Sequence, residues 1–165
     1  MARGRSELRR LQKTGIEDAR HVVDENIWSW WQQEWDDEKD KGAWTKRLIP
    51  KVRDWASRSH GVTSYHLTQM LTGHGCFQAK LYSFTRAESP HCLSCGDNID
   101  DAEHTFFKCG RWARKLADLE ATVDQVVTPE TIIPIMLHSK RNWEAVERYV
   151  TLILRTKEEE ERLRR

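Results

Sequence analysis

The sequence predicts a mainly α-helical fold, an irregular multi-helix domain with a small metal-binding knuckle embedded in it. Apolar residues recur at spacings of three and four over much of the chain, and no strand-like alternation persists. Four prolines and eight glycines punctuate this helical pattern. Three of the four cysteines gather with one histidine in the stretch CLSCGDNIDDAEHTFFKC, which runs from Cys92 to Cys109.

The composition limits the classes of function. A chain of 165 residues fits one domain and would bury roughly 70% of its unfolded surface, so its core need not depend on a metal. The formal net charge is only +1, so any contact with nucleic acid must come from local patches. No apolar run follows the basic N-terminal residues, and no stretch approaches eighteen apolar residues. We therefore expect no secretory signal, no membrane span and a reducing compartment, where clustered cysteines are usually metal ligands.

The N-terminal third divides into an arm and a helical segment. Residues 1–15 are basic and are expected to form a flexible arm. Residues 16–61 form a tryptophan-rich helical segment. Its first helix is expected over about 16–41, and a shorter one over 50–61 with Pro50 as its first residue.

Five of the eight tryptophans fall within seventeen residues of this segment and invite two interpretations. Stacked aromatic rings can bind bases. Aromatic side chains also supply large apolar areas to a core, and we favour this second interpretation for the cluster. Its members are Trp28, Trp30, Trp31, Trp35 and Trp44.

The middle of the chain, 62–125, is expected to be a helical region that contains the knuckle at 92–109. Thr63 should cap its first helix, whose Leu67, Met70 and Leu71 would face inward. The amphipathic stretch RWARKLADLEATV should form a further helix after the knuckle.

The last part, 126–165, is expected to hold the C-terminal helices. Thr128 should cap the first of them, and Pro134 should kink or restart it. Asn142 should cap a long final helix. Its buried stripe is predicted to consist of Trp143, Val146, Val150 and Ile153.

The cysteine–histidine cluster has the spacing Cys-x2-Cys-x8-His-x4-Cys, at Cys92, Cys95, His104 and Cys109. Gly96 directly follows the second cysteine and can adopt the left-handed backbone of a tight knuckle. His104 and Cys109 are five residues apart, so a regular helix would place them about 140° out of phase. We therefore expect the helical turn between them to unwind before Cys109, with Gly110 permitting it.

The cofactor expected at this cluster is Zn²⁺. Three thiolates and one imidazole complete the tetrahedron that zinc prefers, and a site with four protein ligands leaves no position for a reacting water. Such closed sites are structural rather than catalytic. The alternative is three ordinary buried cysteines and a surface histidine.

Four stretches, in this order, resemble one known family: WQQEWDDEKDKGAWTKRLIPKVRDWASRSHG, YHLTQMLTGHGCFQAKLYSF, SPHCLSCGDNIDDAEHTFFKCGRW and TPETIIPIML. Together they look like the C-terminal region of arthropod non-LTR (LINE-type) retrotransposon reverse transcriptases, from about Trp31 to the end of the chain. In that family the region carries a Cys-Cys-His-Cys zinc knuckle, whose positions match the four candidate ligands above.

The resemblance implies a role in target-primed reverse transcription. The region would hold element RNA or target DNA for the polymerase domain of the same polyprotein, in the nucleus and in a cytoplasmic ribonucleoprotein. The chain itself contains no YADD-like aspartate pair, so we expect a noncatalytic module that neither polymerises nor cuts. No small-molecule substrate is expected.

Basic residues near the knuckle are the candidates for contacting phosphates. Their alternative interpretation is a set of ordinary solvated charges balanced by acidic residues. The candidate nucleic-acid-binding residues are His91, Lys108, Arg111, Arg114 and Lys115, together with Lys46 and Arg47 in a second cluster.

Two further interpretations stay open. The tryptophan-rich helix or the last helix could dock on the polymerase body or a host protein, as apolar anchors at helical spacing do. His60, His66 and His74, with Cys76, could also form a second metal site or supply a general base, although a packed glycine-flanked turn is the simpler interpretation.

Overall fold

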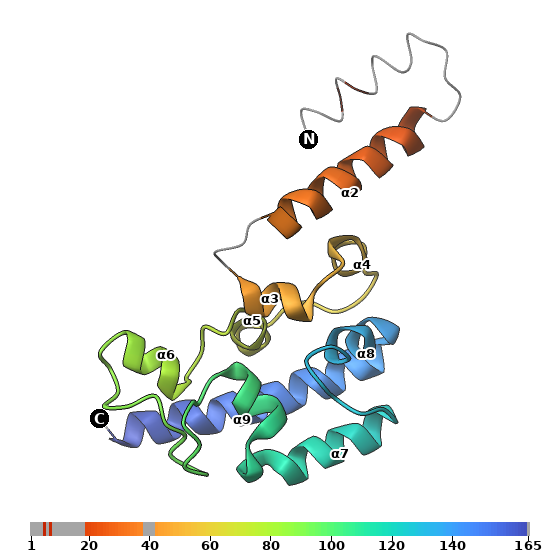
Figure 1. Cartoon of the computed structure of the whole chain (residues 1–165). Coiled ribbons are helices and arrows are strands. Elements are labelled where there is room, and N and C mark those ends of the chain that lie inside the picture. Colours follow the sequence, from red (N-terminus) through yellow and green to blue (C-terminus); the bar gives the residue numbers. More distant parts are fainter. Residues whose placement is uncertain (1–4, 6, 8–18, 38–41, 165) are drawn as a thin grey trace.

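The computed structural model describes residues 5, 7, 19–37 and 42–164, and within these residues it is helical and has no strand (Figure 1). The predicted mainly α-helical class is therefore confirmed. None of the helices in the described part is long and apolar enough to cross a membrane. The elements are α2 (Ala19–Asp37), α3 (Ala43–Leu48), α4 (Val52–Ala56), α5 (Tyr65–Thr72), α6 (Gln78–Ser83), a π-helical turn η1 (His104–Lys108), a 3-10 turn η2 (Gly110–Trp112), α7 (Ala113–Val123), α8 (Ile132–His138) and α9 (Lys140–Arg164).

The core forms around the long helix α9. Helices α5, α7 and α8 all pack against it (Figure 1). The predicted stripe on α9 is confirmed, because Trp143, Val146, Val150 and Ile153 are each at most 2% exposed. Leu67, Met70 and Leu71 of α5 are buried in the same core, as predicted.

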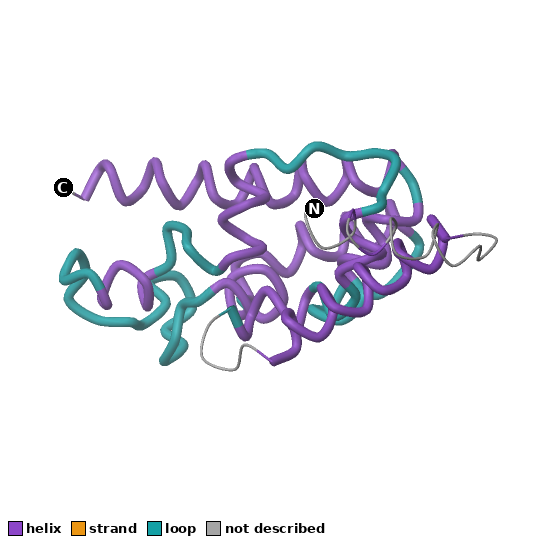
Figure 2. The backbone as a smooth tube through the Cα atoms, turned by 90° about the horizontal axis from the view of Figure 1, so that it is seen from above, coloured by secondary structure: helices purple, strands orange, loops and turns teal. Residues whose placement is uncertain are grey.

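The N-terminal helix α2 extends away from this core and contacts α4 (Figures 1 and 2). Side chains of α2 bond to the backbone that joins α3 to α4. Gln32 donates to the Pro50 carbonyl at 2.9 Å and accepts from the Val52 amide at 3.0 Å. The Trp35 indole donates to the Ile49 carbonyl at 3.0 Å. These bonds fix α2 at its C-terminal end.

The tryptophans divide between packing and exposure. Trp35 and Trp44 pack against the core, and the Trp44 indole donates to the Met70 carbonyl at 2.8 Å. Trp30 and Trp31 on α2 are 45% and 42% exposed. The core interpretation therefore holds for part of the cluster and is wrong for Trp30 and Trp31.

Several predicted helix starts are wrong by a few residues. The helix expected over 50–61 spans Val52–Ala56 only, because Gln32 already engages the backbone of Pro50 and Val52. Ser64, not Thr63, caps α5, its hydroxyl accepting from the Leu67 amide at 3.4 Å.

The C-terminal starts differ in the same way. Ser139 and not Asn142 caps α9, since the Ser139 hydroxyl accepts from the Asn142 amide at 3.1 Å. Thr128 and Thr131 form a turn, joined by the Thr128 amide and the Thr131 hydroxyl at 2.8 Å, so α8 begins at Ile132. Pro134 is then in the first turn of α8, where its missing N–H costs no helical hydrogen bond.

The expected basic arm, 1–15, lies outside the described residues apart from Arg5 and Glu7. The same holds for both ends of the helix expected over 16–41, of which 19–37 is described as α2.

Candidate metal centre

The first pair of cysteines sits in a tight knuckle closed by backbone hydrogen bonds. The Gly96 amide donates to the Cys92 carbonyl at 2.9 Å, and the Cys92 amide donates to the Asp97 carbonyl at 2.8 Å. Gly96 has a φ of 76°, the left-handed conformation that its position predicts. No atom would lie within 4 Å of a Cβ there, so the backbone angle alone favours glycine.

The second pair of ligands is joined by the π-helical turn η1. The Cys109 amide donates to the His104 carbonyl at 2.8 Å, an i→i+5 bond. A turn of this width brings residues five apart onto nearly the same side of the helix. The helix leaves its regular form before Cys109, as expected: it widens into a π turn and ends at Lys108, and Cys109 itself is extended. Gly110 has no positive φ and its Cβ would meet nothing, so it is not what permits the turn.

The helical stretch that contains η1 begins at Ala102 and is capped by an acidic side chain. Asp101 is the capping residue, and its Oδ1 accepts from the amide of His104, three residues later, at 2.7 Å. The cap fixes where the helical turn begins and hence where the imidazole points.

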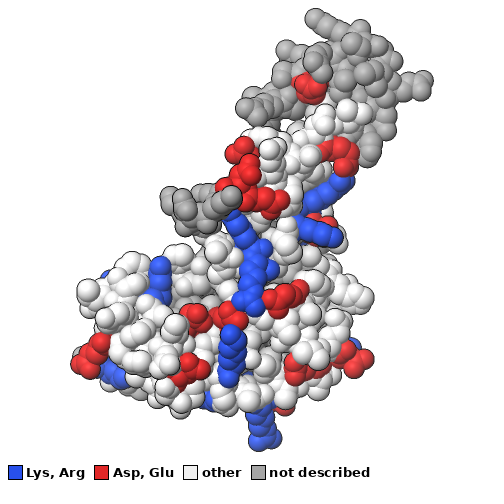
Figure 3. Space-filling model, viewed as in Figure 1, with Lys and Arg blue, Asp and Glu red and all other residues white. Residues whose placement is uncertain are grey.

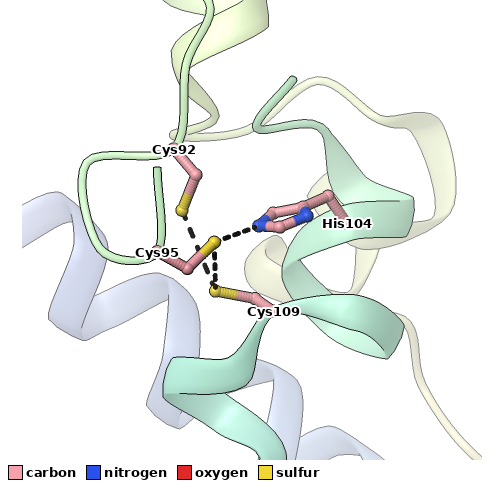
Figure 4. A group of neighbouring side chains, drawn as sticks. All are labelled: Cys92, Cys95, His104 and Cys109. Atoms are coloured by element: carbon pink, nitrogen blue, oxygen red, sulfur yellow. Dashed lines mark hydrogen bonds between the residues drawn. The ribbon is translucent and has the colours of Figure 1, made fainter. Parts of the chain in front are cut away.

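The four candidate ligands converge on one point (Figure 4). Their ligand atoms all lie within 4.8 Å of one another. Cys109 Sγ is 3.8 Å from Cys92 Sγ and 3.9 Å from Cys95 Sγ, so no disulfide joins these sulfurs. His104 Nε2 lies 3.3 Å from Cys95 Sγ. Three sulfurs and one nitrogen at such distances form a group that could hold a metal ion.

The thiols differ in how readily they lose their protons. Burial raises the pKa of the Cys92 thiol, but bonds from the Ser94 and Cys95 amides and from neighbouring side chains outweigh it and lower the pKa to about 7. Burial raises the pKa of Cys109 to about 12, and a charge on Cys92 adds to the rise. Without a cation, three thiolates this close repel one another, and a bound metal ion removes that repulsion.

A carboxylate orients the imidazole. His104 Nδ1 lies 3.4 Å from Asp97 Oδ2, which leaves Nε2 to face the sulfurs. Histidines that bind metals commonly use the second ring nitrogen in this way. His104 itself is only 5% exposed.

A buried ion pair anchors the metal loop to the core. Asp100 is 1% exposed and accepts from Lys157 of α9 with both oxygens, at 2.9 and 2.7 Å. It also accepts from the Thr105 hydroxyl at 2.8 Å and from the Gln78 amide at 2.9 Å. Asp100 thereby joins the loop to both α6 and α9.

Two further bonds link the turn to α9. The Tyr149 hydroxyl donates to the Phe106 carbonyl at 2.7 Å. Arg111 donates to Ser94 in the knuckle at 3.0 Å and forms an ion pair with Glu160. The metal loop is therefore tied to the last helix along its length.

The predicted cationic residues differ in their surroundings. Lys108 pairs with Glu103 at 2.8 Å, and Arg47 pairs with both Glu103 and Glu130 at 2.7 Å. Lys108 and Arg47 together hold the pKa of Glu103 below its usual value. In Figure 3 basic and acidic side chains lie side by side on this view of the molecule, so the face is not uniformly positive.

The other predicted cations are more open. His91, Arg114 and Lys115 are exposed, and none of them forms an ion pair with a described carboxylate. Lys46 is half-buried on α3 and interacts with a neighbouring group. The structure thus places Arg114 and Lys115 together on α7, while Lys46 and Arg47 lie on α3.

The possible second metal site is not formed. His60 lies 3.0 Å from the Met136 carbonyl, and His66 lies 3.2 Å from Glu158. His74 lies 2.9 Å from the Thr72 carbonyl. Within the described ranges, only the Cys92 cluster brings three or more candidate ligands together.

Sequence reasoning missed the residues that support the site. Asp97 and Asp100 lie inside the knuckle sequence, and their carboxylate oxygens could have been proposed as partners for the imidazole and for a helix amide. Lys157 lies in a run of charged residues that looks solvated, so nothing local identifies it as buried.

Comparison with known proteins confirms the resemblance to non-LTR retrotransposon proteins. A Pol polyprotein from the type-1 retrotransposable element R1 2 of Nasonia vitripennis is 31% identical over 116 residues, which is 68% of this chain and 28% of the relative. A putative 115 kDa protein in the element R1DM of Drosophila melanogaster is 36% identical over 91 residues, 54% of this chain and 9% of the relative. A Pol polyprotein from the R1 4 element of Nasonia vitripennis is 25% identical over 147 residues, 79% of this chain and 36% of the relative.

The chain is therefore homologous to polyproteins of R1 non-LTR retrotransposons, and it spans between 9% and 36% of these relatives' lengths. No protein-family profile matches it, and no solved structure does either.

Proposed function

We propose that this chain, a homologue of R1 retrotransposon polyproteins, is a noncatalytic, zinc-stabilised module of such a polyprotein that holds nucleic acid for reverse transcription. The observation that carries this proposal is the convergence of Cys92, Cys95, His104 and Cys109 on one point. The homology to R1 proteins is the reason for placing this module in a retrotransposon polyprotein.

The spacing of the ligand atoms favours zinc. A tetrahedral zinc ion with Zn–S bonds of about 2.3 Å and a Zn–N bond of about 2.0–2.1 Å would separate two sulfurs by about 3.8 Å and a sulfur from the nitrogen by about 3.6 Å. The observed sulfur separations are 3.8 and 3.9 Å, and the sulfur–nitrogen separation is 3.3 Å. When bound, zinc would neutralise the thiolates and fasten the knuckle to the turn.

A site of this kind supports structure rather than chemistry. Its four protein ligands complete the coordination of zinc and leave no position for a water. The buried Asp100–Lys157 pair and the Tyr149–Phe106 bond hold the site against the core. We therefore assign the metal the task of ordering 92–109.

The position within the polyprotein is also part of the proposal. We place the module in the C-terminal region, next to the polymerase domain, and we expect it to act on element RNA or target DNA in the nucleus. The exposed cations beside the knuckle, Arg114 and Lys115, are the first candidates for phosphate contacts.

The test is zinc stoichiometry followed by binding. Protein purified without added metal should contain one zinc ion per chain. Filter binding with single-stranded RNA and duplex DNA, before and after chelation, should show affinity that depends on the metal. A metal-free chain in which 92–109 stays as ordered as in the zinc-loaded chain, or a zinc-loaded chain that binds neither nucleic acid, would contradict the proposal.

A second candidate function is protein interaction, and the exposure of α2 favours it. Trp30 and Trp31 are 45% and 42% exposed on a helix that extends away from the core. Such a helix suits docking on a groove of the polymerase body or of a host protein. Capture of that partner by the zinc-loaded chain after nuclease treatment, and its loss with Trp31→Ala, would support this function.

A further inference from the structure

A groove beside the C-terminal half of α9 has the features of a nucleic-acid site. It has a volume of about 460 Å³ and is lined by α5, α6, the α5–α6 turn and the C-terminal half of α9. Figures 1 and 2 show α6 and the C-terminal end of α9 at the same end of the molecule. A volume in this range suits one small organic group, such as a base with its sugar.

Two exposed aromatic rings line this groove. Tyr65 at the start of α5 is 69% exposed, and Phe84 after α6 is 58% exposed. Exposing an aromatic face to water is unfavourable, and every base has a π-face that can cover such a ring by stacking on it. Lys80 Nζ lies 4.9 Å from the Phe84 ring centroid, so a cation already stands beside one of these platforms.

The basic side chains of the groove form no ion pair within the described residues, whereas its acidic side chains already have partners. Lys80, Arg86 and Arg162 line it, and none of them pairs with a carboxylate of the described residues. Glu158 interacts with His66 at 3.2 Å and with Gln69 at 3.3 Å. Glu161 pairs with Arg164 at 3.2 Å. Three of the cations near the knuckle, Lys108, Arg47 and Arg111, are by contrast each paired with a carboxylate.

The groove continues along α9. A neighbouring groove of about 800 Å³ shares Tyr65 with it and is lined by Arg148 and Arg155. These arginines and Arg162 recur every seven residues and are all exposed, so they lie on one side of α9 at a rise of about 10.5 Å per step. Three carboxylates also line this second groove, Glu144, Glu147 and Glu159. The first groove is therefore the better phosphate site, and the second is its extension.

We propose that single-stranded nucleic acid binds in the groove between α5, α6 and α9, with bases stacked on Tyr65 and Phe84 and phosphates held by Lys80, Arg86 and Arg162. This assignment rests on the proposed function, because it identifies where on the chain the nucleic acid would bind. Unpaired strands are favoured over duplexes, because the two aromatic rings can stack only on bases that are splayed out.

The first experiment measures binding of the full zinc-loaded chain to a short fluorescent polyuridylate RNA and to a blunt DNA duplex. Tyr65→Ala and Phe84→Ala should each weaken RNA binding by about tenfold. Tyr82→Ala is the matched control, since Tyr82 is 50% exposed on α6 but does not line the groove. It should leave binding unchanged.

The second experiment tests the charges. Lys80→Ala with Arg86→Ala should reduce the slope of log affinity against log salt by about 1.4, the value for two phosphate contacts to a single strand. Lys51→Ala with Arg141→Ala removes the same charge from exposed sites outside the groove and should not change the slope. Photo-crosslinking with thiouridine-substituted RNA should label peptides that contain Tyr65 or Phe84.

Each outcome decides between the two proposals. If the groove variants bind RNA like the unmodified chain while Arg114→Ala with Lys115→Ala weakens it, the groove assignment is wrong and the proposed function stands. If the unmodified zinc-loaded chain binds neither probe, the proposed function itself fails. If the groove variants keep RNA binding but lose capture of a partner protein, the groove serves a protein instead, which also overturns the assignment.

Discussion

Lys157 Nζ contacts both carboxylate oxygens of Asp100, at 2.9 and 2.7 Å, across 57 residues of sequence. The Asp100 side chain is 2% exposed and the Lys157 side chain 13%, so the pair is largely shielded from water. Because Asp100 lies between the two halves of the metal ligand set, this contact transmits the position of α9 to the metal loop.

Replacing Asp100 by asparagine should therefore be strongly destabilising. It would leave Lys157 charged and without its buried partner, at a cost of about 3–5 kcal/mol. Urea unfolding of the zinc-loaded protein measures this loss. The double variant Asp100→Asn with Lys157→Met removes the unpaired charge as well and should recover part of the loss. A single variant within about 1 kcal/mol of the unmodified protein would show that the pair does not hold the loop.

The cysteine outside the cluster offers a matched control for metal binding. Cys92→Ser should abolish stoichiometric zinc binding, because an uncharged hydroxyl replaces a thiolate ligand. Cys76→Ser should keep one zinc ion per chain, since Cys76 contacts the Lys157 carbonyl and not the cluster. Zinc content after dialysis, with limited proteolysis of 92–109, is the measurement. Equal zinc content in the two variants would refute the assigned ligand set.

The reactivity of Cys76 should depend on pH in a defined window. Burial raises the pKa of this thiol from 9.0 to about 11. A thiol whose pKa is higher in the folded than in the unfolded protein contributes its full stabilisation below the unfolded pKa. That stabilisation is lost as the pH rises from 9.0 toward about 11. The thiolate is the reactive form, so alkylation of Cys76 in the folded protein should stay slow up to pH 9 and accelerate toward 11. Mass spectrometry of iodoacetamide-treated, zinc-loaded protein tests this, with the urea-unfolded chain as reference.

Gly61 should tolerate no side chain. It has a φ of 81°, and an added Cβ would lie 2.2 Å from the Trp143 ring. Gly61→Ala should cost at least about 3 kcal/mol from backbone strain and overpacking combined. Gly110→Ala is the control, because its Cβ would meet no atom within 4 Å and its φ is not positive. Thermal unfolding of both variants is the measurement, and equal effects would contradict this account.

The Tyr149 hydroxyl should contribute through a single buried bond. Tyr149→Phe keeps the ring and leaves the Phe106 carbonyl without its 2.7 Å donor, at a cost of about 1–3 kcal/mol. Because this carbonyl belongs to the turn between His104 and Cys109, zinc affinity should fall as well. Competition with a chelator measures the zinc affinity. A loss of stability without any loss of zinc affinity would show that the Tyr149–Phe106 bond does not support the metal site.

The sequence was sufficient for the helical class and for the four candidate ligands. Apolar residues at helical spacing identify the buried face of α9, since Trp143 and Val150 are indeed buried. Cysteines and a histidine close in sequence identify the cluster, because a short loop limits how far apart they can lie.

Local reasoning failed where distant side chains decide the backbone. Helix α4 begins at Val52 rather than Pro50 because Gln32 of α2 bonds to both residues' backbone. The helix ends before Cys109 as expected but does so by widening into a π turn, and the Cys109–His104 bond that defines this turn leaves no pattern in the residues between. The role of Lys157 depends on the packing of α9 and is invisible in its charged neighbourhood.

The Asp100–Lys157 contact also bears on how the chain folds as it is made. A ribosome delivers the knuckle well before it delivers α9, and domains generally fold from the N-terminal side during synthesis. The knuckle of a nascent chain can thus bind zinc before Lys157 is available to pair with Asp100. At that stage α5, α7 and α8 also lack α9, the helix against which they pack. The emergence of α9 from the exit tunnel would then complete, in one late step, both the neutralisation of that carboxylate and the closure of the core.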